Sequence, residues 1–552
     1  MIKQIARLFA LTVFAGTSIP FFAQQPENVA SKSPSGKIEA EQLRSPEFSG
    51  ELRRQPKDSE DGGVKPESVA IPKAAADSSK KDASPKAQTP PAPSHKLGSL
   101  TVSGSWRFRT EAWDWFQPAT GENAYAFSHS LLRLGIGQKR EKFEWFLEGA
   151  QDAIFGLPTS SVLPGRPGQL GLGGTYFAAN GNGPNNANGF VKQAYVGFKI
   201  PANGKLRLGR FGFLDGADVI PKDKTLATLV STRITQRLIG DFSFSAVGRS
   251  FDGVQLTFDA GSNNFTLLGA RPTRGVYQID GMGELNVDLF YGAYTVPIAS
   301  GKSAGELRVF AAGYVDERGT VLKTDNRPVA VRTADKDHIR VGTYGADYVH
   351  VFHTDTRGQF DFLVWGALQN GSWGAQKQRS GAFVGEFGWQ PATRVLNPWF
   401  SAGYSFGSGD SNPNDNTHST FFQILPTPRP YARFPFYNMM NNEDFYGTAV
   451  FRLPRSLVVR SEAHALRLAN SQDLWYGGGG AFQPHTFGYT GRTSGGNGSL
   501  ANVWDVSLDC PLRYGFSITT YYAHAWGKNV IASIYPTGTT AQFGYVETNF
   551  RF

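Results

Sequence analysis

The side chains of this 552-residue sequence that could do chemistry are arginines and glutamates at alternate positions. Arg107, Arg109 and Glu111 follow one another at this spacing, and Arg460 and Glu462 repeat it. A guanidinium presents its N–H donors in a planar fork, so it pairs well with carboxylate groups. Residues i and i+2 share one face of a β-strand, which indicates that these charges line one face of a sheet. Such rows can bind anions or pair with each other.

Signatures of catalytic or metal chemistry are weak in comparison. Asp410, Asn412 and Asn414 match the opening of a calcium-binding loop, but Phe421 stands where that loop needs its final glutamate. A turn is therefore the better interpretation. His464 lies in a predicted strand without the neighbouring ligands of a zinc site, and no local motif marks a hydrolase triad. We predict a protein that is not an enzyme and that has no metal site and no cofactor.

The elements that position these charges are strands with two different faces. Alternation of apolar and polar residues begins at Leu97 and continues to the C-terminal Phe552. In the first strand, Trp106 and Phe108 lie on the face opposite Arg107. Apolar faces rich in Phe, Trp and Tyr, with charges on the opposite faces, are typical of strands between lipid and water. No apolar run long enough for a membrane helix follows the N-terminus.

We therefore predict an all-β fold, a closed antiparallel transmembrane β-barrel. Closure is required because an open sheet edge in lipid would leave N–H and C=O groups without partners. The spacing of candidate strands indicates about eighteen strands. About sixteen is the alternative, because the sequence does not define the ends of several strands well. Phe550 and Phe552 share one face of the last strand. A strand that ends in an aromatic residue resembles the assembly signal of bacterial outer-membrane barrels, so the barrel-assembly machinery is an expected partner.

The residues before the barrel divide into two predicted regions. Lys3 and Arg7 precede an apolar run, so residues 1–23 are predicted to be a signal peptide. Residues 24–96 are rich in Pro, Ser, Lys and Glu and have too little apolar surface to offset the entropy of ordering. We predict that they form a disordered periplasmic tail, either a bare spacer or a contact for periplasmic proteins. The barrel domain is predicted over residues 97–552, in the outer membrane and in contact with its lipid.

Composition narrows the possible partners. The formal net charge is +9, and charged residues make up 18% of the chain. The basic excess is spread thinly, whereas nucleic-acid binding needs a clustered basic face, so we expect no nucleic-acid partner. The single cysteine, Cys510, cannot form an internal disulfide, so the fold must close through hydrogen bonds and packing.

Long connections are the second place where function could reside. The connection over residues 215–241 is basic, and we predict that it folds inward and narrows a channel. An ordinary solvated loop is the alternative. The candidate constriction residues are Lys222, Lys224, Arg233 and Arg237. The other long connections are predicted over residues 155–189, 408–444 and 470–502.

Several short sequence segments, taken in their order and spacing, resemble those of a known family. They are the segments 206–210, 249–254, 404–410, 421–427, 463–469 and 473–476. They resemble the alginate export family, whose members form outer-membrane barrels that pass an anionic polysaccharide. The resemblance implies a barrel of about eighteen strands with an arginine-lined constriction.

From these observations we predict passive passage of a hydrophilic, anionic solute, such as a uronate-type or other acidic saccharide, through a charged lumen. The alternatives are a barrel-borne enzyme that acts on lipid or glycan, and an exported soluble β-protein that binds carbohydrate. A bracing role between neighbouring strands is the alternative for each charged residue. The candidate lumen residues are Arg107, Arg109, Arg133, Arg249 and Arg460, with Glu111, Glu386 and Glu462 as counter-charges.

Overall fold

The computed structural model describes residues 94–319, 321–393, 395–427, 433–434, 438–477 and 490–552, and the structure below refers to these. The predicted signal peptide, 1–23, and the predicted tail up to residue 93 lie outside the described residues. Residues 94–96, which we assigned to the tail, already belong to a strand, β1 (Ser94–Leu97).

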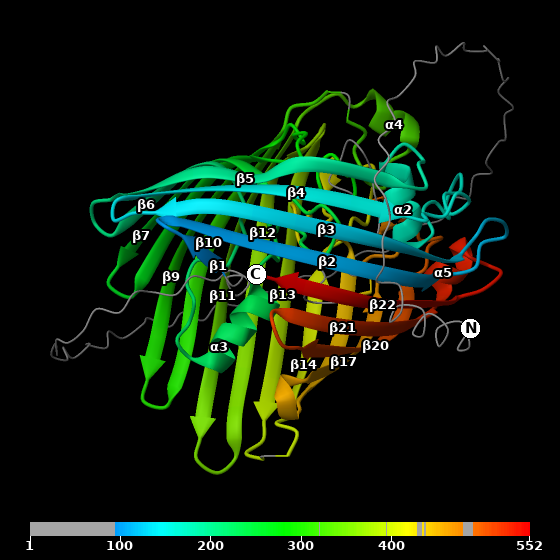
Figure 1. Ribbon diagram of the computed structural model, residues 1–552. Helices are drawn as coiled ribbons and strands as arrows, with labels where there is room; N and C mark the ends of the chain where they lie inside the picture. The colour runs from blue at the N-terminus through cyan, green and yellow to red at the C-terminus, as the bar shows by residue number, and fades with distance from the viewer. Residues whose placement is uncertain (1–93, 320, 394, 428–432, 435–437, 478–489) are drawn as a thin grey trace, which may run out of the picture. The chain divides into compact units, whose positions relative to one another are not determined.

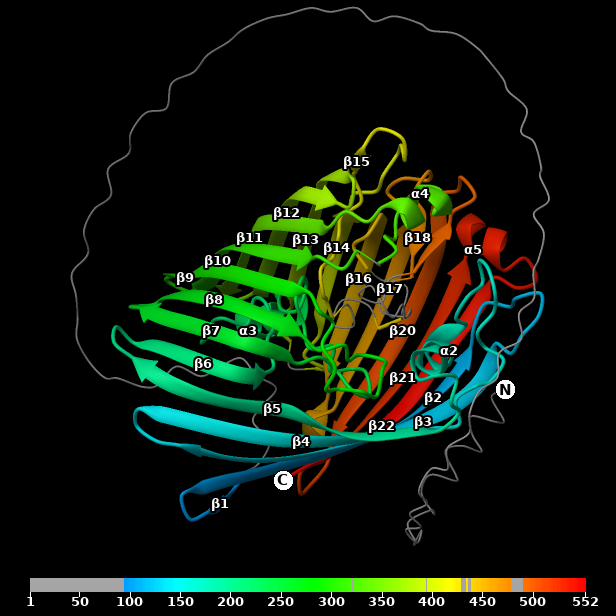
Figure 2. The same ribbon diagram turned by 90° about the horizontal axis from the view of Figure 1, so that it is seen from above.

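Eighteen antiparallel strands form one closed ring, which confirms the predicted fold class. The ring is seen from two directions in Figures 1 and 2. Its strands are β2 (Leu100–Asp114), β3 (Ala124–Lys139), β4 (Phe143–Phe155), β5 (Asn186–Ile200), β6 (Gly204–Phe211), β7 (Phe251–Ala260), β8 (Asn263–Pro272), β9 (Asp288–Ser300), β10 (Ser303–Asp316), β11 (Ile339–Thr354), β12 (Gly358–Trp373), β13 (Gln376–Gln390), β14 (Trp399–Gly407), β16 (Asn442–Arg452), β17 (Val458–Arg467), β20 (Ser499–Pro511), β21 (Phe516–Gly527) and β22 (Thr540–Arg551).

The remaining described elements are short. None of the helices in the described part of the chain is long and apolar enough to cross a membrane. The short strands are β1, β15 (Thr417–His418), β18 (Leu474–Tyr476) and β19 (Gly491–Thr493). The helices are α2 (Gly171–Ala179), α3 (Lys224–Leu229), the π-helical turn η1 (Val230–Ile234), α4 (Val329–Ala334), the 3-10 turn η2 (Pro454–Ser456) and α5 (Asn529–Ile534).

The ring closes where its first strand meets its last. β2 pairs with β22 in an antiparallel register that places Trp106 beside Phe550. The pairing is extended by Gly104 and Phe552, whose N–H groups donate to each other's carbonyl oxygens at 2.9 and 3.0 Å. The ring of Phe552 covers Gly104 so closely that a Cβ there would lie 2.1 Å from it. Any side chain larger than that of glycine at this position would have to displace the ring of Phe552.

Alternating burial distinguishes the two faces of the wall. On one face large apolar side chains are exposed, such as Leu368 (70%) and Phe387 (56%). On the other face Arg109, Glu111 and Glu386 are buried. The exposed face is the outer, lipid-facing surface of the ring, and the buried face is the wall of the lumen.

The connections differ in length between the two ends of the ring. At one end, here called the short-turn end, they span two to eight residues, as in 201–203 and 391–398. At the other, the long-loop end, most are longer, including 156–185, 212–250, 408–441 and 468–498. These four correspond to the long connections expected from the sequence. In Figure 1, α2, α4 and α5 all lie toward the long-loop end.

Segments from the long connections fill part of the lumen. Phe421, Phe422 and Leu425 of the connection 408–441 have no exposed surface, and Ile239 forms an isolated bridge with Leu425. The inner wall carries apolar residues where these segments pack, and Trp365 and Leu363 are buried there. The lumen is therefore less uniformly polar than we expected, because inward segments cover part of the wall and shield it from water.

We expect that replacing Gly104 with Val hinders closure, because the new side chain would displace the ring of Phe552. The fraction of barrel that resists unfolding in detergent until heated, measured by gel mobility, should fall several-fold. Gly149→Val is the matched control, since a Cβ at Gly149 meets nothing within 4 Å. Equal yields of folded barrel from the two variants would contradict this account of closure.

Candidate functional site

The connection 212–250, here called the inward segment, passes through the lumen (Figure 2). It leaves β6 at the long-loop end, yet its helix α3 contacts the short-turn ends of β11 and β12. Asp223 lies 2.8 Å from His353, and Thr225 donates a hydrogen bond of 2.7 Å to Gln359. The side chain of Asp223 also accepts from the N–H of Leu226 and caps α3. The segment therefore spans the lumen from one end toward the other.

Arg233 fixes the middle of the inward segment to the wall. Its guanidinium lies 3.4 Å from Glu386 of β13 and 3.0 Å from Glu462 of β17, and it donates to Thr448 at 2.9 Å. Arg460 also donates to Glu462. Burial lowers the pKa of Arg233, but the two carboxylates outweigh this effect and raise it above its ordinary value. Arg233 therefore stays charged and holds three strands, β13, β16 and β17, and the segment together.

The opposite wall of the barrel holds the inward segment through hydrogen bonds to the backbone of the segment. Arg107 donates to the carbonyl oxygen of Ser243 at 2.5 Å, and Arg109 donates to that of Phe244 at 2.9 Å. The guanidinium of Arg109 also lies 3.8 Å from the centroid of the Phe244 ring and bonds to Glu547 at 2.7 Å. These arginines therefore combine ion pairing within the wall with anchoring of the segment.

A third anchor joins the start of the segment to β10. Arg308 lies 2.7 Å from Asp347 of β11 and 3.8 Å from Asp215 of the inward segment. Burial raises the pKa of Asp215 to about 6, although the positive charge of Arg308 opposes this shift. The carboxyl oxygen of Asp215 also accepts from the N–H groups of Leu238 and Ile239, so it ties the two arms of the segment together.

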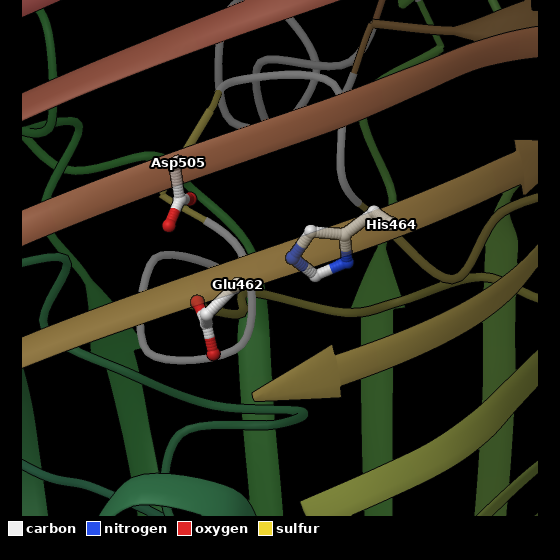
Figure 3. A group of neighbouring side chains, drawn as sticks. All are labelled: Glu462, His464 and Asp505. Carbon is white, nitrogen blue, oxygen red and sulfur yellow. The ribbon is translucent and has the colours of Figure 1, made fainter. Parts of the chain in front are cut away.

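One group of side chains in the described part of the chain has the composition of a metal site. Ligand atoms of Glu462, His464 and Asp505 lie within 4.8 Å of one another, and Figure 3 shows them turned toward a common point. His464 bonds through Nδ1 to Asp444 at 2.8 Å. Glu462, however, already pairs with the guanidinium groups of Arg233 and Arg460. These two cations disfavour a third one, and the group acts as part of the ion-pair network.

The structure brings most of the sequence-predicted lumen residues onto the inner wall. Glu386, Arg460 and Glu462 lie together around Arg233. On β2, Arg107, Arg109 and Glu111 share the inner face, and Arg133 lies half-buried on the inner face of β3. A role of these residues in selectivity stays a prediction.

Arg249 differs from its predicted position. We placed it in a strand by extending the alternation, but β7 begins only at Phe251. Arg249 belongs to the inward segment and donates to the carbonyl oxygens of Gly240 and Leu425 at 3.1 and 3.3 Å. Arg249 therefore joins the inward segment to the connection 408–441. It can do so because the chain bends into the lumen before β7 starts.

The four candidate constriction residues fall into two pairs. Lys222 and Lys224 are exposed, whereas Arg233 and Arg237 are buried. The guanidinium of Arg237 lies 5.3 Å from the ring centroid of Trp365 on the wall and donates to the carbonyl oxygen of Arg233. The buried pair therefore holds the segment in place, and the exposed pair lies where water and solutes can reach it.

Some inner-wall charges were missed by sequence reasoning. Arg308 lies two residues after Glu306, and both face inward, so the same alternation could have identified it. Lys192 of β5 donates to the carbonyl oxygens of Val247 and Arg249 at 3.1 and 3.0 Å. A β-bulge beside it shifts the register of β4 and β5, and this local change leaves no mark in the alternation.

A family model for alginate export matches residues 178–526, which is more than half of the chain. The chain belongs to the alginate export family. This result confirms the resemblance found in the sequence.

Among solved structures, OccAB2 from Acinetobacter baumannii is similar to this alginate export family chain at 11% identity, with a TM-score of 0.50. The match covers 83% of this chain and 99% of that one, and it shows a shared barrel fold. The outer membrane protein OpdK from Pseudomonas aeruginosa matches at 9% identity over 82% of this chain and 98% of that one, with a TM-score of 0.48. None of the curated proteins matches the sequence. The chain has the fold of an outer-membrane porin or channel.

Replacing Arg233 with Ala should loosen the inward segment, because Glu386 and Glu462 would lose a cation inside a buried site. Breaking a buried ion pair costs about 3–5 kcal/mol, so amide hydrogen exchange over residues 212–250 should accelerate at least about tenfold. Arg271→Ala is the control, since Arg271 pairs with Asp288 on the surface and is half exposed. Exchange as slow as in the unmodified protein would refute the anchoring role of Arg233.

Proposed function

We propose that this outer-membrane barrel is a channel for passive passage of an anionic saccharide, and that it is not an enzyme. The supporting observation is a set of basic side chains on the inner wall from β2 to β6. They are Arg107, Arg133, Lys192 and Arg207. The acidic groups beside them include Glu144 and Glu148 of β4, and Glu547 of β22, which lies 4.0 Å from Arg107.

The register places these bases on adjoining strands. Arg133 pairs with Ser105, and Arg107 with Leu131, so the two guanidinium groups occupy diagonal positions on neighbouring strands. Arg207 contacts Gln255 at 3.3 Å. Arginine suits the carboxylates of acidic sugars through its fork of donors, and the low-dielectric wall focuses the field of each charge into the lumen.

The inward segment is the proposed constriction. It occupies the lumen between walls that carry Arg107 on one side and Glu386 on the other, so a passing solute must move beside it. Lys222 and Lys224 are exposed on it and add positive charge. Any movement of the segment would change the width of the path, and selectivity would depend on its charges as well as on those of the wall.

We infer the orientation of the barrel in the membrane from the lengths of the connections between its strands. Outer-membrane barrels have short periplasmic turns and longer extracellular loops, so we place the short-turn end in the periplasm. Residues 24–93 would then precede β1 on the periplasmic side, as a spacer or as a contact for periplasmic proteins. Phe550 and Phe552 would mark the last strand for the barrel-assembly machinery.

Single-channel recording in planar bilayers tests the proposal. The unmodified barrel should prefer anions, and uronate oligomers should block its current. Arg133→Gln should reduce the anion preference, measured as reversal potential in a salt gradient, because it removes one charge from the wall. Arg107→Ala and Arg460→Ala should each reduce this preference modestly.

The matched control is Arg513→Gln, which removes an exposed charge from a turn at the short-turn end. This variant should keep the reversal potential of the unmodified channel. A folded barrel that conducts no ions would refute the channel, and a preference for cations would refute the anionic solute.

A further inference from the structure

Basic side chains gather on the outer face of the barrel near the long-loop end of β11, β12 and β13. Arg340 pairs with Ser372, and Ser372 pairs with Lys377, so the three residues form one row across neighbouring strands. Their chain neighbours Val341 and Gln378 are buried in the lumen, so the row itself points outward. Both Arg340 and Lys377 are exposed.

More basic groups extend this row into a patch. Arg379 is exposed on the same face of β13 and pairs with Asn370 of β12. Lys336 and His338 belong to the connection that precedes β11 and are exposed. A pocket lies among them, lined by Lys336, Asp337, His338, Arg340, Ser372 and Gly374. We call the five residues Lys336, His338, Arg340, Lys377 and Arg379 the outer basic patch.

Acidic groups do not neutralise the outer basic patch. Glu317 lies 2.6 Å from Arg340 and 3.9 Å from His338, and Asp337 lines the pocket. The side chains of Arg340 and Glu317 are 58% and 57% exposed, so water screens this ion pair. A ligand with several negative charges can compete with such a pair, because it contacts several bases at once.

The patch lies at the edge of the lipid-facing surface. Tyr344, Leu368 and Phe383 are exposed on the same outer face, at 54%, 70% and 43%. They lie on β11, β12 and β13, and each is four residues from Arg340, Ser372 and Arg379 respectively, which is about 13 Å along a strand. The basic groups therefore stand at the height of the headgroups of a bilayer whose acyl chains cover these apolar residues.

We propose that the outer basic patch binds a lipid whose saccharide headgroup carries more than one phosphate, in the leaflet that surrounds the long-loop end. Guanidinium and ammonium groups recognise phosphate oxygens through charge-assisted hydrogen bonds. The pocket between Lys336 and Arg340 admits one phosphate, and Lys377 and Arg379 on β13 contact a second. The acyl chains lie on Tyr344, Leu368 and Phe383. This function is separate from passage of a solute, because the patch lies on the opposite face of the wall from the lumen.

Binding of diphosphoryl lipid A to the full-length barrel in detergent, measured by native mass spectrometry, tests the proposal. The triple variant Arg340→Gln, Lys377→Gln, Arg379→Gln should bind this lipid at least about tenfold more weakly, because each basic group near a lipid phosphate contributes to affinity. The matched triple variant Lys142→Gln, Arg455→Gln, Arg513→Gln removes the same charge from the short-turn end and should bind as the unmodified protein does.

Two results would overturn the assignment. One is equal weakening by both triple variants, which would mean that the overall charge and not the patch attracts the lipid. The other is equal affinity for phosphatidylglycerol, which would mean that a single phosphate suffices and that the patch does not select the headgroup. Resistance of each variant to unfolding in detergent before heating establishes that both barrels are folded.

Discussion

Every backbone N–H and C=O group at the depth of the hydrocarbon must find its partner within the protein, because lipid offers none. The chain meets this condition by pairing β2 with β22, its first and last ring strands. Once the ring is closed, the side chains of each strand can face only lipid or lumen, in alternation. The exposed position of Trp106 and the anchoring position of Arg107 follow from that one condition.

This condition also explains which parts of the structure could be predicted from the sequence. Alternation is a local pattern, so it correctly placed Glu386 and Glu462 on the inner wall although their strands are far apart in sequence. It failed where local geometry departs from a regular strand. Arg249 lies before β7 and not within it, and Lys192 lies beside a β-bulge that shifts the register. Neither departure can be recognised from the spacing of apolar residues in the sequence.

The inward segment illustrates a second limit. Its basic composition indicated a role in the lumen, but composition could not tell which of its charges would be buried. Arg233 is fixed by carboxylates from β13 and β17, and Lys224, nine residues earlier, remains exposed. The difference arises from contacts between distant parts of the chain, which depend on the closed ring being present. The burial of apolar wall residues such as Trp365 also depends on contacts between distant parts of the chain, because these residues are buried only where a segment in the lumen covers them.

The electric field in the lumen depends on how much side-chain charge remains after ion pairs have formed. Glu462 is neutralised by Arg233 and Arg460, so the β13–β17 side offers little net attraction to an anion. Arg207 instead contacts a neutral group, the side chain of Gln255. The positive charge of Arg207 is not cancelled by this contact and acts on whatever shares the lumen. In the proposed function, an anionic solute would pass along the β6 side of the lumen, so its selection would come from one side of the wall and not from a uniform ring of charge.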